Sequence, residues 1–530
     1  MDKDEKEHKL AAYMRYLFLM ILMAGVGQAQ IDTNYIAADP IDLISLEKSQ
    51  FVDGLNYQNL NIRPFINQWP EQGLDIRAYC QSDLYYNDNA PNLENTSELW
   101  VGKGTTFFSS FHFQISHRYF FFSIEPYYQY SSNKPFESYD NSEELPILKN
   151  FVRKFQVLNA GPGRGEEAFS ELRLRESQFF LHWNGLGAGI SNSGMWWGPG
   201  IHTSLNMTTN TTGLPRVELG TLREQRMGNF GLVAKYVFSQ LDKNQAEPFY
   251  TAIFGSVTYY SKPVVTLGGS RTFLSGGKYA NEDVKWQDAA LLPLQPFRKE
   301  KLYDEETGEN PSDKTDQTLS LFLSLLFPES GLKLFLEYGW NDHRWDWYDL
   351  RAHPDHSGAS VIGFRKYGLF YRPELYMGFE YANLMKSPYY PQRATPDWYG
   401  RGVFDFGVYD GRRFAAHSGS DSDDMLIYAG YMDDKQNLSL GFNYERHGKI
   451  YSVLLLDISD DFRYPEGKLE LRLNYWRDIS IGRLYISYEY EFTENIGSPP
   501  QGVSPRVDTP ERKANIFGIG IRSQLYSRKP

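Results

Sequence analysis

The sequence contains a single cysteine, Cys80, and no apolar run long enough for a membrane-spanning helix. One cysteine excludes an internal disulfide, so an exported chain of 530 residues needs another source of stability, such as a closed hydrogen-bonded barrel. Cys80 lies far from the N-terminal apolar segment, which excludes a lipoprotein acylation site, and we expect a small buried or lipid-facing residue there. The longest later run, residues 319–327, is interrupted by two serines and is shorter than the roughly 18 to 20 residues a membrane helix needs.

The chain also lacks an excess of basic residues, since its net charge is −12. This excludes the usual basic footprint of a nucleic-acid-binding protein, so we expect no nucleic-acid partner. Aromatic residues are abundant instead: 38 Tyr and 35 Phe bring the aromatic content to 16%, although the average residue is polar. Such a surplus suits strands with one apolar face and one wet face. A large soluble β-protein is the alternative that composition leaves open.

The N-terminus has the order of a secretory signal. A charged region, residues 1–15, precedes the apolar run Leu17–Val26, and small residues stand at Gly27 and Ala29. We predict a signal peptide over residues 1–29, cleaved after Ala29, and one barrel domain over residues 30–530. An uncleaved anchor helix is the alternative, but the apolar run is too short to span a bilayer comfortably.

Much of the mature chain alternates apolar and polar residues with a period of two. Side chains alternate between the faces of a strand, so each such segment has one apolar and one polar face. A soluble sandwich would turn the polar face to water, and a membrane barrel would turn it to the lumen. The signal peptide, the missing disulfide and the aromatics near strand ends favour the barrel. The alternating segments are residues 111–116, 332–338, 438–445, 469–475 and 483–492, and the strand-end aromatics are Tyr130, Trp340, Trp476 and Tyr490.

The length predicts an all-β fold, a transmembrane antiparallel β-barrel of about 16 to 20 strands at roughly 25 to 30 residues for each strand and its connection. Residues 515–526 fit a closing strand, with Phe517 and Ile519 outward and Gly518 inward. Short helices are expected around residues 40–49 and 143–154. The longest polar connectors belong on the extracellular side; they are residues 131–154, 278–314, 342–359, 387–424 and 493–513.

One motif is distinctive. The segment Ser191–Met207 contains Trp197-Gly198-Pro199-Gly200, and Leu214–Thr221 follows with Pro215 and Glu218. Together they resemble the Wzi capsule-assembly family. Weaker blocks downstream are compatible with that family; they are residues 337–339, 354–357, 363–366, 380–382 and 445–446.

The resemblance implies an outer-membrane barrel of about 18 strands with short N-terminal or periplasmic helices. It implies that the protein binds capsular or extracellular polysaccharide as a lectin and helps to organise it at the cell surface. We expect a monomer embedded in outer-membrane lipid and delivered by the barrel-assembly machinery. The long loops at residues 278–314 and 387–424 match no pattern of the family, so ligand contacts in loops are not carried over from it.

The motif Trp197-Gly198-Pro199-Gly200 also has a physical interpretation. Glycine permits positive φ and proline fixes φ, so the four residues predict a tight reversal with aromatics beside it. Two roles are open: a turn or plug folded inside the lumen, or direct contact with a ligand.

Two loops have the composition of a carbohydrate site. Aromatic rings stack on the C–H faces of sugars, while Arg and Asp bind hydroxyl or carboxylate groups. The alternative is that the aromatics belong to the membrane interface and the arginines pair with acids in the lumen. The candidate residues are Arg344, Trp345, Trp347 and Tyr348 in one loop, and Arg393, Asp397, Trp398, Tyr399 and Arg412 in the other.

The rival functions are a porin or sugar channel and a barrel hydrolase. The nearest imitation of a hydrolase site is His182 with Ser191 and Ser193, which form no recognisable motif. His343, His353 and His356 complete no metal-ligand pattern. The sequence therefore predicts a non-enzymatic protein with no catalytic residue, metal or cofactor.

Overall fold

The computed structural model describes residues 35–38, 40–52, 58–136, 167–278, 284–294, 315–341, 351, 356–385, 398–399, 407–447, 465–496 and 511–529. The expected signal peptide and the expected helix at residues 143–154 lie outside these ranges. The helix expected at residues 40–49 is present as α2 (Pro40–Val52).

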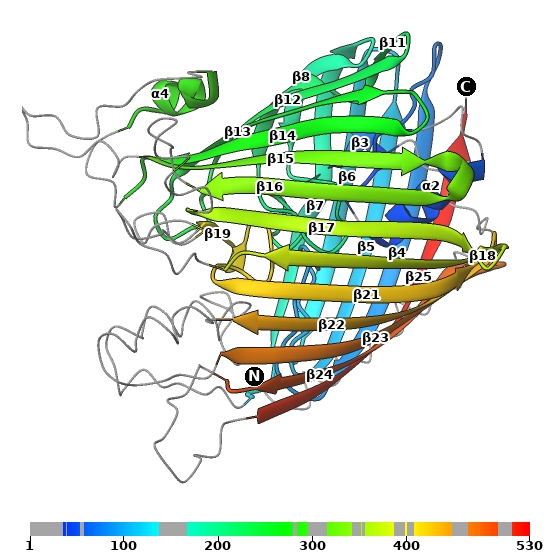
Figure 1. Ribbon diagram of the computed structural model, residues 1–530, viewed down its shortest axis with the longest axis vertical. Helices are drawn as coiled ribbons and strands as arrows, with labels where there is room; N and C mark the ends of the chain where they lie inside the picture. Colours follow the sequence, from blue (N-terminus) through cyan, green and yellow to red (C-terminus); the bar gives the residue numbers. More distant parts are fainter. Residues whose placement is uncertain are drawn as a thin grey trace, which may run out of the picture.

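In the described residues, eighteen antiparallel strands form a closed barrel, with β10 and β11 as two parts of one strand (Figure 1). The predicted fold class is therefore confirmed. The expected closing strand is β25, which pairs with β4 and joins the two ends of the sheet. The strands are β4 (Asp75–Asn87), β5 (Gly104–Ser116), β6 (Phe120–Ser131), β7 (Phe169–Trp183), β8 (Leu186–Ser191), β10 (Arg216–Thr221), β11 (Gln225–Met227), β12 (Phe230–Gln240), β13 (Phe249–Tyr259), β14 (Val264–Ser275), β15 (Thr315–Phe327), β16 (Leu332–Asn341), β17 (Gly358–Leu369), β18 (Arg372–Asn383), β21 (Ser422–Met432), β22 (Gln436–His447), β23 (Glu466–Ile479), β24 (Gly482–Glu494) and β25 (Glu511–Arg528).

The two ends of the barrel differ in their connections. Short turns join β7 to β8, β15 to β16 and β23 to β24 at one end, which also carries the first residue of β4 and the last residue of β25. Long connections such as those after β14 and β18 leave the opposite end (Figure 1). Short turns belong on the periplasmic side and long loops on the extracellular side, which orients the barrel.

The barrel wall exposes its apolar side chains and buries its charged ones, which is the opposite of a soluble protein. On β16, Leu334 and Leu336 are 38% and 43% exposed, whereas Lys333 and Glu337, which alternate with them, are 2% and 0% exposed. On β25, Phe517 and Ile519 face outward as expected. An apolar outer surface around a charged interior is the pattern of strands that cross a membrane, and it excludes the soluble alternative.

One expected interface aromatic faces the other way. Trp476 on β23 is 3% exposed and packs inside the barrel, where the guanidinium of Arg483 lies 3.9 Å from its ring centroid. The prediction for Trp476 was wrong because it considered only where Trp476 stands along the strand, and not which face of the strand carries its side chain. Cys80 on β4 is half-buried on the outward face, which agrees with the expected lipid-facing position.

Several segments of the chain fold inside the barrel and fill much of its lumen, and we call these segments together the plug. The N-terminal part contributes α2 and the small pairs β1 (Tyr35–Ile36) with β3 (Phe65–Ile66) and β2 (Ile62–Arg63) with β9 (Trp196–Trp197). A loop from the opposite end adds β19 (Val408–Tyr409) and β20 (Arg412–Arg413). Outside the lumen, α4 (Trp286–Leu291) and the turns η1 (Leu292–Leu294) and η3 (Pro328–Ser330) complete the described helices. None of the helices in these ranges has the length and apolar character needed to cross a membrane.

Candidate functional site

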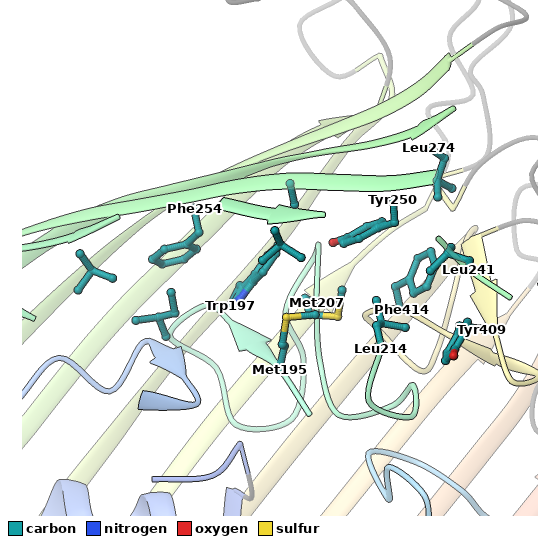
Figure 2. Close-up of a cluster of buried hydrophobic side chains, with 14 of the residues drawn as sticks. Met195, Trp197, Met207, Leu214, Leu241, Tyr250, Phe254, Leu274, Tyr409 and Phe414 are labelled. Carbon is teal, nitrogen blue, oxygen red and sulfur yellow. The ribbon is translucent and has the colours of Figure 1, made fainter. Parts of the chain in front are cut away.

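The distinctive motif lies at the centre of this internal plug. Trp197 is 2% exposed and packs against Met207 of the same loop and against Phe254 of the wall, at a ring-centroid distance of 6.1 Å (Figure 2). Its backbone N–H donates to the carbonyl of Met207 at 3.1 Å, which closes the loop on itself. Of the two roles left open for the motif, the structure supports the plug.

Two buried glutamates of the wall hold the loop that follows the motif. Glu380 on β18 accepts the backbone N–H groups of Ile201 at 2.7 Å and His202 at 3.0 Å. Glu337 on β16 accepts the N–H of Leu205 at 3.1 Å. These bonds give the buried carboxylates the donors that a charge out of water requires, and they fix the loop to one side of the barrel.

Both motif glycines leave room for these carboxylates. A Cβ on Gly198 would lie 2.7 Å from an oxygen of Glu337, and a Cβ on Gly200 would lie 2.9 Å from an oxygen of Glu380. The Gly200 position would also approach the carbonyl of Thr203 to 2.2 Å. At Gly198 the nearest atom to the added Cβ would be Ser204 Oγ, at 2.5 Å, so at both positions the backbone passes too close to its neighbours for a larger residue.

A buried ion cluster connects the motif to the N-terminal helix. Arg365 on β17 donates to the carbonyl of Pro199 at 2.8 Å and to both carboxylate oxygens of Glu47 on α2, at 2.7 and 3.0 Å. Lys333 donates to Glu47 at 2.7 Å. Burial opposes ionisation of Glu47, but the charges of Arg365 and Lys333 outweigh it and lower its pKa to about 2.

Three of the five weaker sequence blocks thus meet around the strong one. Glu337, Arg365 and Glu380 come from three different blocks, and all three bind the loop that begins at Trp197. The wall strands β16, β17 and β18 are neighbours in the sheet, and the three side chains face inward together. These scattered sequence similarities therefore mark one packing unit, which consists of the loop after Trp197 and the wall residues that bind it.

Of the predicted ligand contacts, three lie in the described residues and all are buried. Trp398 and Tyr399 are 4% and 7% exposed, and both donate to the carbonyl of Leu205, at 3.3 and 3.2 Å. Arg412 is 1% exposed and donates to the carbonyl of Leu99 at 2.6 Å. In the structure these three side chains hold the plug in place through hydrogen bonds, and their contact with a glycan remains a prediction. Arg344, Trp345, Trp347, Tyr348, Arg393 and Asp397 lie outside the described residues.

Glu218, in the second segment of the family motif, makes contacts within the barrel wall. It accepts from Arg216 Nε at 2.5 Å and lies 3.8 Å from Lys235 Nζ, all on the inner face of β10 and β12. The three-residue imitation of a hydrolase site does not assemble. Ser191 contacts Ser193 at 2.8 Å. His182, however, lies opposite Gly187, which precedes Ser191 by four residues on β8, and this places His182 roughly 13 Å from Ser191 along the strand.

Beside the plug, the lumen contains a cavity of about 1300 Å³. Glu374 and Asp433 at the short-turn end line it, so the cavity reaches the periplasmic side, while Glu94 and His202 line it next to the plug. Both rings and charged groups line it; Arg175, for example, lies 4.6 Å from the ring centroid of Phe108. The lining residues come from many strands, so no local sequence pattern could predict the cavity.

A closed barrel with an apolar outer surface and a plug of its own chain defines this protein as a transmembrane β-barrel of the outer membrane. The sequence matches the family model of the capsule assembly protein Wzi over residues 88–495. The chain therefore belongs to the Wzi family of capsule assembly proteins, as its motifs indicated.

The fold is similar to that of a solved structure described as Wzi, an outer-membrane protein involved in group 1 capsule assembly in Escherichia coli and a carbohydrate-binding β-barrel. The similarity has a TM-score of 0.53 at 10% identity and covers 95% of this chain and 96% of that one. Acinetobacter baumannii OccAB2 (TM-score 0.41, 7% identity, 86% and 98% covered) and Pseudomonas aeruginosa OccK5 (0.40, 8%, 86% and 98%) are less similar. No curated protein matches the sequence.

Proposed function

We propose that this protein binds capsular or extracellular polysaccharide at its outer face and organises it at the cell surface. The observation that carries the proposal is the family match over residues 88–495, on a barrel whose lumen is occupied by its own plug. The solved Escherichia coli Wzi, which has the same fold, is described as carbohydrate-binding. A plug anchored by buried carboxylates suits a surface receptor better than a diffusion pore.

We assign glycan contact to the loops at the long-loop end, with Arg344, Trp345, Trp347 and Tyr348 as one group of contacts. A second group of contacts is assigned to Arg393 and Asp397, which belong to the same connection between β18 and β21 as Trp398, Tyr399 and Arg412. Rings that stack on sugars and arginines that bind carboxylates would select an acidic polysaccharide. The protein acts as a monomer that the barrel-assembly machinery inserts after removal of residues 1–29, and it binds without turnover.

The test is binding of purified capsular polysaccharide to the full-length protein in detergent, together with capsule retention in a deletion strain. Saturable binding and loss of surface capsule on deletion support the proposal. A folded barrel that retains no glycan, in a strain whose capsule is unchanged, contradicts it. Release of shortened glycan or of lipid products during incubation would establish a hydrolase instead.

Planar-bilayer recording addresses the channel alternative. Because the plug is anchored to the wall at Glu337, Arg365 and Glu380, we expect the wild-type protein to show no steady large conductance. Large stable currents from the intact protein would make the barrel a diffusion channel.

A further inference from the structure

Four buried side chains of the lumen bring their ligand atoms within 4.8 Å of one another: His202, His417, Asp424 and Glu445. Each is at most 4% exposed. His202 lies in the loop that begins at Trp197, and His417 lies between β20 and β21. Asp424 on β21 and Glu445 on β22 are direct cross-strand partners, so the sheet register places both carboxylates side by side on the inner face.

The separations fit one coordination sphere. His202 Nε2 lies 3.1 Å from Asp424, and His417 Nε2 lies 3.2 Å from Asp424 and 3.3 Å from Glu445. Ligand atoms about 2.0 to 2.2 Å from a tetrahedral metal ion lie roughly 3.3 to 3.6 Å from each other. The three separations are at most a few tenths of an ångström shorter than this, and all four ligand atoms lie within 4.8 Å of one another.

Hydrogen bonding alone leaves the site unsatisfied. His417 Nε2 is surrounded by oxygens of Asp424, Glu445 and Glu94, the last at 3.5 Å, yet neither ring nitrogen of His417 makes a well-aligned hydrogen bond. One proton on that nitrogen can serve only one of these acceptors. A cation at the centre would contact both imidazoles and both carboxylates at once.

The two other clusters of carboxylates nearby already pair with a lysine or an arginine, and Glu445 belongs to the first of them as well as to the histidine cluster. Lys468 Nζ lies among Glu94, Glu445 and Glu470, at 3.1 Å from Glu445 and 3.0 Å from Glu470. Arg472 pairs with Glu470 and Glu489. Among the described residues, the ionic partners of Asp424 are only the two histidines. The site that combines two imidazoles with two carboxylates is thus the one suited to a metal.

We propose that His202, His417, Asp424 and Glu445 bind one divalent transition-metal ion of the Zn²⁺ class. Imidazole nitrogen and carboxylate oxygen suit this class of ion, and four protein ligands form a closed, structural site. The two histidines belong to the plug and the two carboxylates to the wall, so the ion would fasten one to the other.

The surroundings support this assignment. Asn443 donates to Asp424 Oδ1 at 2.6 Å, and His447 Nε2 lies 3.1 Å from the second oxygen of Glu445, as partners that orient metal ligands do. His202 lines the 1300 Å³ cavity, which supplies an entry path.

The test uses Co²⁺ as the probe on the full-length protein in detergent after treatment with a chelator. We expect one Co²⁺ per chain, visible d–d absorption bands of low-symmetry coordination, and displacement by Zn²⁺. His417→Gln should weaken Co²⁺ binding by about tenfold or more. The matched control is His112→Gln, because His112 is a lumen histidine paired with one carboxylate, Glu125, at 2.9 Å; it should bind like wild type.

Heat-dependent gel migration reports whether each variant has a folded barrel. X-ray absorption of the Zn²⁺-loaded wild type needs no variant and should show two imidazole ligands. A folded wild type that binds no Co²⁺ or Zn²⁺ beyond the level of His417→Gln would overturn the proposal and leave a proton network at the site. A Zn²⁺ spectrum without imidazole scattering would overturn it as well.

Discussion

Arg365 on the barrel wall donates its Nε to Glu47 on α2 at 2.7 Å, and both side chains are 1% exposed. The same guanidinium donates to the carbonyl of Pro199 in the family motif. One arginine therefore joins three parts of the chain that are far apart in sequence: the N-terminal helix, the plug loop and β17. Because all of them are buried, the pairing depends on having both charges in place.

Glu47→Gln should lower the free energy of unfolding by about 3 to 5 kcal/mol, since it leaves Arg365 and Lys333 buried without their shared carboxylate. Urea unfolding in detergent measures the change. The control is Glu329→Gln, which removes an exposed ion pair with Lys262 and should cost less than about 1 kcal/mol. Equal effects of the two variants would contradict the role assigned to Glu47.

The same carboxylate predicts a pH dependence. Its pKa is lowered from 4.5 to about 2 by Arg365 and Lys333, against the effect of burial. A lowered pKa in the folded state stabilises the fold above about pH 4.5, by about 3 kcal/mol, and this stabilisation is lost as the pH falls toward 2. The difference in unfolding free energy between wild type and Glu47→Gln should therefore shrink from pH 7 to pH 2.5. A difference that stays constant would show that another group controls it.

Gly200→Ala should disturb the plug and spare the barrel. The new Cβ would lie 2.2 Å from the carbonyl of Thr203, so the loop has to shift at a cost of about 1 to 3 kcal/mol. We expect faster proteolysis of the plug loop with normal heat-dependent migration of the barrel. The control is Gly255→Ala on β13, where the nearest atom is 3.8 Å away and no change is expected.

Trp345→Ala combined with Trp347→Ala should weaken glycan binding by roughly tenfold, because each stacking ring contributes about 0.5 to 1.5 kcal/mol. Folding should be unaffected. Trp398→Ala separates support from contact: its ring is buried against the plug, so this variant should be destabilised by about 3 to 5 kcal/mol. Equilibrium glycan binding and urea unfolding, measured on all variants, distinguish the two effects. Full glycan binding by the double variant would remove the first loop from the site.

The family blocks show which parts of the plug and its contacts could be predicted from sequence motifs. The segment around Trp197 was recognisable because glycine and proline stand where the backbone passes close to other groups. The blocks around Glu337, Arg365 and Glu380 were visible only as weak similarity. Their common purpose, to bind the loop after Trp197, follows from neighbouring strands that face the same lumen.

The sequence by itself determined strands with one apolar and one polar face, because side chains alternate along a strand, and together with the signal-like N-terminus and the family motifs it favoured a membrane barrel over a soluble β-protein. It also predicted the closing strand at Phe517, but it left the role of the Trp197 motif open between a plug in the lumen and contact with a ligand. Only the tertiary structure decided which way Trp476 faces and which carboxylates meet His202 and His417. The physical reason is that periodicity is local, whereas the register of the sheet and the path of the plug bring together residues more than two hundred positions apart.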